Sequence, residues 1–466
     1  MKIEQLYTKC LSEAAYYIES EGEVAIIDPM REVEPYLKMA EENGDTIKYI
    51  FETHFHADFV SGHLDLANKT GAEIIYGPTA KTGYKVTVAE DGQEFKLGTA
   101  TFKVLHTPGH TLESSCFILR DENGKDKALF SGDTLFIGDV GRPDLAVKSD
   151  LTKEDLAGLL FDSLATKIKP LADDVVVYPA HGAGSSCGKN LSKETFDLLG
   201  NQKENNYALQ LTSKDEFVRQ LTEGILPPPQ YFPKNAMLNM QGYKSIDDVM
   251  ESAQNALSLH QFKTHRDNEI LILDTRHQND FVTAFVPASM FIGLDGAFAT
   301  WLGTLVEDLD APIVLITEVG MEEEAVLRCA RVGYNNVLGY LDGGFETWSN
   351  AGEPTDSFES ISAEEFSKRH GTSNLVTLDV RKEGEYNSSH VTAVKLFPLD
   401  FCNSALNELP KEQEYLIHCG GGYRSVIACS LMKKAGFDSV IDVAGGFDAI
   451  KETNISMEET VCPSTL

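Results

Sequence analysis

The sequence predicts an α/β protein of several domains, and three observations support this. Short β-branched strands alternate with helical stretches and Gly/Pro turns along the chain. The length of 466 residues exceeds what one core usually holds, and about 150 residues per domain suggests three domains. The second half of the chain also contains an internal repeat. Together these features favour an α/β multidomain fold.

The repeat lies beyond residue 244. Leu273-Asp-Thr-Arg276 matches Leu378-Asp-Val-Arg381, and Asp342-Gly-Gly-Phe345 matches Ala444-Gly-Gly-Phe447 at nearly the same offset. Each copy has a strand ending in Asp-x-Arg, a second strand, a helix and a glycine turn, which indicates a parallel α/β sheet. A proline-rich segment ending at Pro233 precedes the repeat. We therefore expect domains at residues 1–244, 245–354 and 355–466.

The composition excludes several classes of partner. Lys plus Arg is 40 and Asp plus Glu is 72, so the net charge is −32, which repels nucleic acid and anionic membranes. No apolar run reaches the roughly 18 residues of a membrane span, and the N-terminal residues do not resemble a signal peptide. The eight cysteines include no CxxC pair. We expect a cytoplasmic protein without nucleic-acid or membrane partners.

Residues that can bind metals follow four separate apolar strands. The first group is Tyr49-Ile-Phe-Glu-Thr-His54-Phe-His56-Ala-Asp58-Phe59, and three further strands are followed by His110, Asp133 and His181. A single histidine after a strand is usually a hydrogen-bonded structural residue, but four strands with the same ending make that interpretation weak. Because strand ends converge on the ligand-binding edge of layered α/β proteins, we expect these side chains to meet.

This pattern resembles the metallo-β-lactamase superfamily, whose motif HxHxDH is followed by separate His, Asp and His ligands. The resemblance covers the first domain and implies an αββα sandwich. One departure matters, because Phe59 stands where the motif ends in histidine. In two-metal members the second metal uses the positions of Asp58, Phe59 and His181. Phenylalanine cannot coordinate a metal, so we expect the second site to be empty.

Within the superfamily, the first domain looks like the persulfide dioxygenases, which hold a single Fe(II) per chain. The resemblance implies three iron ligands: His54, His110 and Asp133. Two imidazoles and one carboxylate leave open positions for O₂ and a thiol-type substrate. Three further residues would orient these ligands: His56, Asp58 and His181. Asp28 is either another such residue or a turn residue at the end of a strand.

Two residues are candidates for contacting the substrate. Arg142, in Gly138-Asp-Val-Gly-Arg142-Pro-Asp144, lies in a segment that also matches the family, and it could bind the carboxylate of a small thiol persulfide. The alternative is a structural salt bridge with an aspartate. Cys187 follows His181 in a glycine-rich loop. It either holds a persulfide beside the iron or is a passive loop thiol.

The last domain has an activated cysteine in Ile417-His-Cys419-Gly-Gly-Gly-Tyr-Arg424-Ser425. The cysteine lies between a strand and a helix expected to start near Ser425, where loop N–H groups, the helix N-terminus and Arg424 favour a thiolate. The segment resembles the rhodanese family, which implies that Cys419 accepts and donates sulfane sulfur. A tyrosine-phosphatase loop needs five residues between Cys and Arg, and this chain has four. Four loop residues are expected to contact the substrate: Gly420, Gly421, Gly422 and Tyr423.

The middle copy lacks a cysteine in the matching loop. Its sequence there is Leu315-Ile-Thr317-Glu318-Val-Gly-Met-Glu-Glu-Glu324, and the glutamates should repel sulfite. Cys329 lies too far along the following helix to replace the missing thiol. We expect a rhodanese-like scaffold or docking domain without sulfur-transfer activity.

These features predict a metallo-β-lactamase αββα sandwich followed by two rhodanese-like α/β domains. The expected function is oxidation of a thiol persulfide with O₂ to sulfite, coupled to rhodanese transfer that forms thiosulfate or runs in reverse. The expected assembly is a homo-oligomer. One alternative is a glyoxalase II-type hydrolase, in which metal-bound hydroxide attacks a thioester. A second alternative is a non-enzymatic persulfide carrier or sensor.

Overall fold

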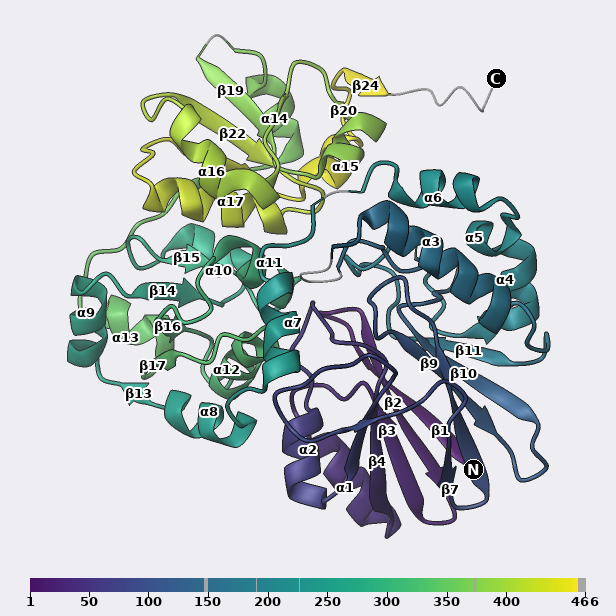
Figure 1. The fold of residues 1–466 in the computed structure, drawn as a ribbon. Helices are drawn as coiled ribbons and strands as arrows, with labels where there is room; N and C mark the ends of the chain where they lie inside the picture. Colours follow the sequence, from purple (N-terminus) through teal and green to yellow (C-terminus); the bar gives the residue numbers. More distant parts are fainter. Residues whose placement is uncertain (146–149, 190, 226, 373, 460–466) are drawn as a thin grey trace. The chain divides into compact units, whose positions relative to one another are not determined.

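The computed structural model describes residues 1–145, 150–189, 191–225, 227–372 and 374–459 (Figure 1). The chain forms two compact units. The first consists of residues 1–249 with 327–335, and the second of 250–326 with 336–466. Both copies of the repeat therefore lie in the second unit, apart from the short segment 327–335 of the first copy.

Two mixed sheets form the centre of the first unit, each six-stranded in the part that the structure describes. The strands of the first sheet, in spatial order, are β1 (Lys2–Thr8), β2 (Glu13–Ser20), β3 (Glu23–Ile27), β4 (Thr46–Glu52), β5 (Glu73–Tyr76) and β6 (Thr87–Val88). Those of the second sheet are β12 (Asp197–Leu198), β11 (Val176–Pro179), β10 (Asp126–Gly132), β9 (Ser115–Arg120), β8 (Ala100–His106) and β7 (Glu94–Leu97).

The side-chain alternation of the strands creates four layers. On β2, Tyr16 packs between the two sheets, whereas its neighbour Tyr17 packs toward α1 and α2 on the outer face. In Figure 1, α1 and α2 lie beside the first sheet and α3 to α6 beside the second. The helices are α1 (Glu34–Asn43), α2 (His63–Thr70), α3 (Lys153–Ser163), α4 (Leu199–Asn205), α5 (Tyr207–Gln210), α6 (Lys214–Thr222), α7 (Phe232–Gln241) and α8 (Ile246–Ala253). The predicted αββα sandwich is confirmed.

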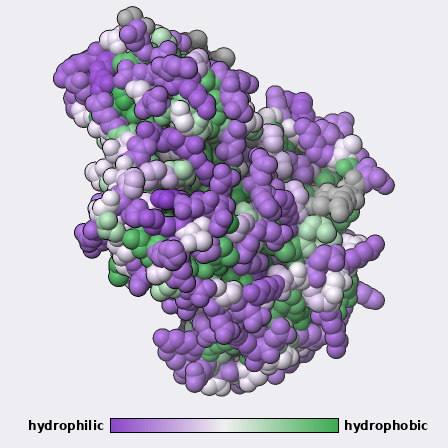
Figure 2. Space-filling view, turned by 90° about the vertical axis from the view of Figure 1, so that its left-hand side faces the viewer, coloured by the Kyte–Doolittle hydropathy of each residue, from purple (hydrophilic) through white to green (hydrophobic). Residues whose placement is uncertain are grey.

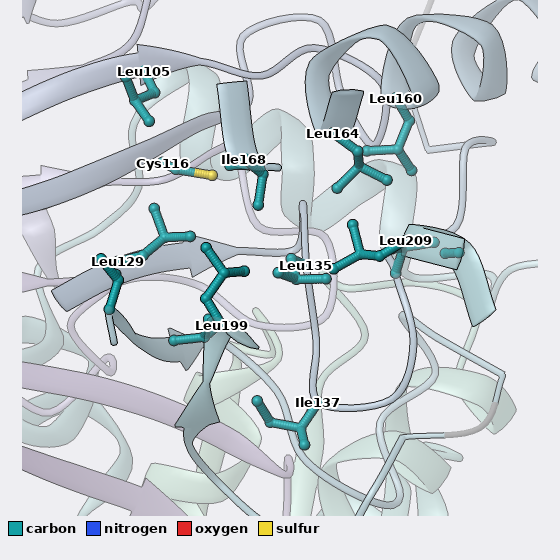
Figure 3. Packing of buried hydrophobic residues seen from close by; sticks show 14 of the residues in the cluster. Leu105, Cys116, Leu129, Leu135, Ile137, Leu160, Leu164, Ile168, Leu199 and Leu209 are labelled. Carbon is teal, nitrogen blue, oxygen red and sulfur yellow. The ribbon is translucent and has the colours of Figure 1, made fainter. Parts of the chain in front are cut away.

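The outer face of the second sheet is covered by one cluster of aliphatic side chains. Figure 3 shows Leu129 on β10, Leu160 on α3 and Leu164 at the start of a π-helical turn (Leu164–Ile168) pointing into it. Each of these three side chains is almost fully buried. The cluster fixes α3 on the sheet, beside the turn that carries His110.

The second unit contains two parallel sheets with the same strand order, each five-stranded in the described residues. The first sheet is β13 (Ala256–Leu257), β17 (Val337–Leu341), β16 (Ile313–Ile316), β14 (Leu271–Asp274) and β15 (Met290–Phe291). The second is β18 (Glu359–Ile361), β23 (Val440–Val443), β22 (Glu414–His418), β19 (Leu375–Asp379) and β21 (Lys395–Leu396). A short ribbon pairs β20 (Ser389–Val391) with β24 (Met457–Glu459). The equal order confirms that the repeat consists of two copies of one α/β fold.

Helices connect and cover these strands. In the first copy they are α9 (Leu259–Asp267), α10 (Gln278–Thr283), α11 (Phe298–Leu305), α12 (Glu322–Arg331) and α13 (Gly344–Asn350). In the second copy they are α14 (Ala363–Arg369), α15 (Glu383–Ser388), α16 (Cys402–Ala405), α17 (Tyr423–Lys434) and α18 (Gly446–Ile450), with two 3₁₀ turns at Leu399–Phe401 and Leu406–Glu408.

The repeated motifs make the same contacts in both copies. Arg381 forms a buried ion pair with Asp379 and lies over the ring of Phe447, with 3.7 Å between the guanidinium carbon and the ring centroid. Arg276 pairs with Asp274 in the same way and lies 4.0 Å from the centroid of Phe345. The Asp-x-Arg and Gly-Gly-Phe motifs therefore contact each other in both copies, through the arginine and the phenylalanine ring.

The surface is largely hydrophilic. Hydrophilic side chains cover most of the face drawn in Figure 2, with apolar residues scattered among them. Among the residues that the structure describes, no helix is long and apolar enough to span a membrane.

Leu129→Ala tests the packing under α3. The substitution removes a fully buried side chain from the cluster, so it should lower the free energy of unfolding by about 2–5 kcal/mol. Urea unfolding of the full chain measures the change. Leu151→Ala is the matched control, because that leucine is 40% exposed and should change stability by less than about 0.5 kcal/mol. Equal losses in the two variants would contradict the assigned packing.

Candidate metal centre and sulfur-transfer loop

The four predicted ligand-bearing strands do end at one place. His54 follows β4, His110 follows β8, Asp133 follows β10 and His181 follows β11. Strands β8, β10 and β11 run in the same direction, because β9 is antiparallel to β8 and β10 and because β11 is parallel to β10. The ends that carry the histidines and the aspartate therefore share one edge of the sheet.

The structure brings His54, His110 and Asp133 together, with one donor atom from each lying within 4.8 Å of the others. His110 Nε2 is 3.3 Å and His54 Nε2 is 3.9 Å from Asp133 Oδ2. All three side chains are buried, and neither oxygen of Asp133 has a hydrogen-bond partner among the described residues. A buried carboxylate without a partner is costly unless a cation compensates it. The donor set therefore fits a metal ion with two imidazoles and one carboxylate.

The imidazole of His54 is oriented by its neighbours. The Thr53 hydroxyl donates to Asp28 Oδ2 at 2.8 Å, so it accepts a hydrogen bond from His54 Nδ1 at 3.0 Å. This assigns the proton to Nδ1 and leaves the lone pair of Nε2 facing Asp133. Burial, together with the adjacent His56, lowers the pKa of His54 well below its ordinary value, so the ring stays neutral. Asp28 therefore acts on His54 through Thr53.

His110 is held by the same principle. Its Nδ1 donates to the main-chain carbonyl of Arg142 at 2.8 Å, which again leaves Nε2 free to face the carboxylate. The preceding Gly109 has a φ of +149°, and a Cβ at this position would lie 2.5 Å from the main-chain nitrogen of Leu160. Helix α3 thus packs directly on the turn, and only glycine fits there.

A second group of donors lies beside the first. Asp58, His181 and Cys187 each place one ligand atom within 4.8 Å of the others. His181 Nε2 is 3.4 Å from Asp58 Oδ2, and its Nδ1 is 2.9 Å from Glu13 Oε2. Burial opposes a charge on His181, but the carboxylates around it raise its pKa well above the ordinary value. Burial also raises the pKa of the Cys187 thiol. The surroundings of His181 therefore favour positive charge.

His56 belongs to a different group of possible metal ligands, formed with Asp28 and Glu52. Its Nε2 lies 3.1 Å from Asp28 Oδ1, and its ring packs against the fully buried ring of Phe59, with 4.5 Å between centroids. Burial disfavours the charged ring, but Asp28 outweighs it and raises the pKa of His56 to about 10. Phe59 thus fills the space beside His56 with an apolar ring that cannot coordinate a metal.

Three residues that position the site were missed from the sequence. Asn239 on α7 donates to the carbonyls of His56 and Phe59 at 2.7 and 2.8 Å, which clamps the motif loop. Glu13 and Thr53 orient the imidazoles of His181 and His54 as described. Thr53 stands next to a ligand in the motif and was detectable there. Glu13 and Asn239 belong to distant segments without a motif of their own.

Arg142 takes the alternative role considered above. Its guanidinium makes a bidentate pair with Asp144 at 2.6 and 2.8 Å, and Nη1 donates to the carbonyl of Ser186 at 3.2 Å. Its main-chain N–H donates to the carbonyl of Cys187 at 3.0 Å. Arg142 therefore braces the Cys187 loop against the turn of His110, and the structure favours the salt bridge over a free anion-binding guanidinium.

Cys419 lies at the end of β22, with a loop N–H directed at its sulfur. The N–H of Gly422 donates to Cys419 Sγ at 3.1 Å, and the Ser425 hydroxyl is 3.6 Å from the same atom. The Gly-Gly-Phe motif also contacts the loop, because the Phe447 N–H donates to the carbonyl of Cys419 at 2.6 Å. A Cβ on Gly446 would lie 2.5 Å from that oxygen. The loop is therefore set to stabilise anionic sulfur.

One expectation about this loop needs correction, because helix α17 starts at Tyr423, earlier than the predicted start near Ser425. The guanidinium of Arg424 pairs through both terminal nitrogens with the carboxylate of Glu385 at 2.7 and 2.8 Å. Glu385 is a residue that no sequence motif indicated. Its carboxylate determines where the Arg424 charge is held.

The other predicted loop residues differ in their surroundings. A Cβ on Gly420 would lie 3.0 Å from Arg424 Nη2, and one on Gly422, whose φ is +92°, would lie 3.0 Å from Gly445 N. Gly421 has open space around it. Tyr423 leaves the loop, since its hydroxyl donates to the carbonyl of Gly293 in the middle copy at 2.6 Å.

The middle copy carries Thr317 in the place of the nucleophile. Ile316 pairs with Asp274 as His418 pairs with Asp379, so the following residues Thr317 and Cys419 are equivalent. A hydroxyl at this position cannot form a persulfide. The strand register therefore places a threonine, and no cysteine, at the position of Cys419 in the middle copy.

The comparisons with known proteins agree with this architecture. The metallo-beta-lactamase superfamily model matches residues 8–181, and the rhodanese-like domain model matches residues 258–351 and 362–453. The crystal structure of a metallo-beta-lactamase from Staphylococcus aureus is similar to this chain, with 31% sequence identity and a TM-score of 0.65. The match covers 73% of this chain and 98% of that chain.

Curated relatives are similar to the first unit. The hydroxyacylglutathione hydrolase GloC of Haemophilus influenzae is 30% identical over 38% of this chain and 89% of its own length. A protein of Schizosaccharomyces pombe named "probable hydroxyacylglutathione hydrolase" is 32% identical over 39% of this chain and 69% of its own length. The chain belongs to the metallo-β-lactamase superfamily and carries two rhodanese-like domains.

His110→Ala tests the three-residue centre. Loss of one imidazole should remove most of the bound metal, whereas His106→Ala, at the end of β8 and outside the centre, should leave the metal content unchanged. Thr53→Val should lower metal affinity about 10- to 100-fold, because it removes only the hydroxyl that orients His54. Elemental analysis of the purified proteins measures all three. Normal metal content in His110→Ala would show that the centre is wrongly assigned.

Proposed function

We propose that the first unit is a persulfide dioxygenase with one Fe(II) per chain, and that the last domain transfers sulfane sulfur through Cys419. The observation that carries this proposal is the centre of His54, His110 and Asp133 beside the buried Phe59. Two imidazoles and one carboxylate suit a non-haem Fe(II) oxygenase. The apolar ring of Phe59 removes an imidazole that the two-metal members of the superfamily use.

The proposed reaction converts RSSH, O₂ and H₂O to RSH, sulfite and two protons. Iron, when bound, would supply open positions for the persulfide sulfur and for O₂. The protein's own residues turn both imidazoles so that Nε2 faces Asp133, through the Thr53 hydroxyl and the main-chain carbonyl of Arg142. The burial of the centre excludes bulk water from the reacting groups.

Cys187 is proposed to contact the substrate in this unit. Its sulfur belongs to the group of possible metal ligands that includes Asp58 and His181. This group lies beside the three-residue centre. Arg142 holds the Cys187 loop through its main-chain N–H and through the carbonyl of Ser186. We propose that this thiol contacts the substrate as an uncharged group, because burial raises its pKa above the ordinary value.

The last domain then handles the sulfane sulfur. In the proposed step the Cys419 persulfide gives its outer sulfur to sulfite, which breaks the S–S bond, forms thiosulfate and returns the Cys419 thiolate. The Gly422 N–H stabilises the anion on both sides of this exchange. Running in reverse, the same groups would take sulfur from thiosulfate. Arg424, braced by Glu385, supplies positive charge near the loop for the anionic acceptor.

Thioester hydrolysis is a second candidate for the first unit, and two observations favour it. The curated relatives described above are named hydroxyacylglutathione hydrolases. Asp58, His181 and Cys187 also form a second group of possible metal ligands. A two-metal hydrolase would use a metal-bound hydroxide as its nucleophile.

Metal analysis and oxygen-electrode traces decide between these two functions. Protein reconstituted with Fe(II) should consume O₂ when given a thiol persulfide, with sulfite as product, and should bind one iron per chain. Hydrolysis of S-lactoylglutathione should be absent. Two tightly bound zinc ions per chain together with rapid thioester hydrolysis would overturn the dioxygenase and support the hydrolase.

Cys419→Ser separates the two proposed activities. Serine matches the thiol in shape but cannot form a persulfide, so thiosulfate formation should stop and sulfite should accumulate while O₂ uptake continues. Arg424→Ala should weaken the same transfer less completely, because the Gly422 N–H remains. Ion chromatography of the products measures both. Normal thiosulfate formation in Cys419→Ser would show that the last domain does not catalyse the transfer.

A further inference from the structure

The middle copy contacts Tyr423, the residue that follows the glycines of the sulfur-transfer loop in the last domain. Tyr423 directly follows Gly422, whose N–H donates to the Cys419 sulfur. Its side chain reaches the middle copy, where its hydroxyl donates to the carbonyl of Gly293 at 2.6 Å and its ring packs against Phe291 with 5.9 Å between centroids.

The middle copy is shaped to receive this ring. A Cβ on Gly296 would lie 2.2 Å from Tyr423 Cζ and 2.5 Å from both Cε atoms, so no side chain fits at that position while the ring is present. Gly296 does not have a left-handed backbone, because its φ lies outside that region. Contact with the tyrosine, rather than backbone conformation, therefore explains why glycine is needed there.

A second contact lies on the same face of α17. Ser430 is seven residues after Tyr423, which places both side chains on one side of the helix. The main-chain N–H of Phe291, on the edge strand β15, donates to the Ser430 hydroxyl at 3.1 Å. The helix that begins at the catalytic loop is thus anchored to the middle copy at its first residue and again two turns later.

We propose that the middle copy, which has Thr317 in place of the nucleophile, is a positioning element for the Cys419 loop. It holds Tyr423, and through Tyr423 it fixes the adjacent Gly422 N–H against the sulfur. Tyr423, Gly296 and Ser430 are positioning residues in this arrangement. This inference deepens the sulfur-transfer role proposed above and rests on it for its function, although the contact itself does not depend on the reaction.

Two substitutions disturb the contact from opposite sides. Gly296→Ala places a methyl group where the ring lies, so it should slow iodoacetamide alkylation of Cys419 and lower kcat for thiosulfate-dependent sulfur transfer by about 10- to 100-fold. Tyr423→Phe removes only the hydroxyl and should reduce both rates by about two- to tenfold. The KM for thiosulfate should change little in either variant, because the anion-binding charge of Arg424 is untouched.

Matched controls separate positioning from general stability. Tyr415→Phe removes a comparable hydrogen bond, from a tyrosine hydroxyl to the carbonyl of Pro410 at 3.0 Å, at the opposite end of β22 from the loop. Gly384→Ala adds a methyl group in open space within the last domain. Both controls should keep the alkylation rate of Cys419 normal, as followed by mass spectrometry of the Cys419 peptide. Persulfide-dependent O₂ uptake should be normal in all four variants.

A double variant provides the decisive result. With the ring absent in Tyr423→Ala, the added methyl of Gly296→Ala no longer collides with it, so the second change should have no further effect on alkylation. Normal alkylation and kcat in both Gly296→Ala and Tyr423→Phe, with only a lower Tm, would overturn the positioning role. Alkylation of Cys419 needs only the thiol and does not depend on sulfur transfer. If the wild-type protein is alkylated but transfers no sulfur, the proposed reaction is refuted, and the alkylation rates of the variants still test the contact.

Discussion

The metal centre depends on one buried carboxylate. Asp133 follows β10 with both oxygens lacking a hydrogen-bond partner in the described part of the chain, and two imidazole nitrogens lie within 4 Å of Oδ2. Such a group is stable only if a cation balances it. The hydrogen bonds of the neighbouring histidines fit this requirement, since each ring must turn its unprotonated nitrogen toward the cation that the carboxylate would bind.

The residues around the centre are held by hydrogen bonds from residues in distant parts of the first unit. Asp28 holds Thr53, Thr53 holds His54, and Asn239 on α7 clamps the loop of His56 and Phe59. These supports explain why a short ligand motif needs a whole αββα sandwich. A ligand that is free to rotate would lose affinity for the metal, because ligand orientation must be fixed before binding.

The two rhodanese-like copies show how one frame serves two purposes. Both keep the Asp-x-Arg pair under a phenylalanine ring, so the sheet edge and the loop position are the same. The loops differ, because one has Cys419 among glycines and the other has Thr317 followed by acidic residues. Packing therefore determines the shared fold of the two copies, and the residues in the loop determine their chemistry.

The sequence alone determined the fold class, the repeat and the residues whose role is local. His54, His110, Asp133 and Cys419 each follow a strand in a motif, and strand ends must converge, so their meeting was predictable. Tertiary structure alone decided the partners of long polar side chains. Arg424 pairs with Glu385, Cys187 joins Asp58 and His181, and Tyr423 reaches Gly293. Most of these contacts join segments far apart in the chain, and a polar side chain takes whichever partner packing brings within reach, which local sequence does not encode.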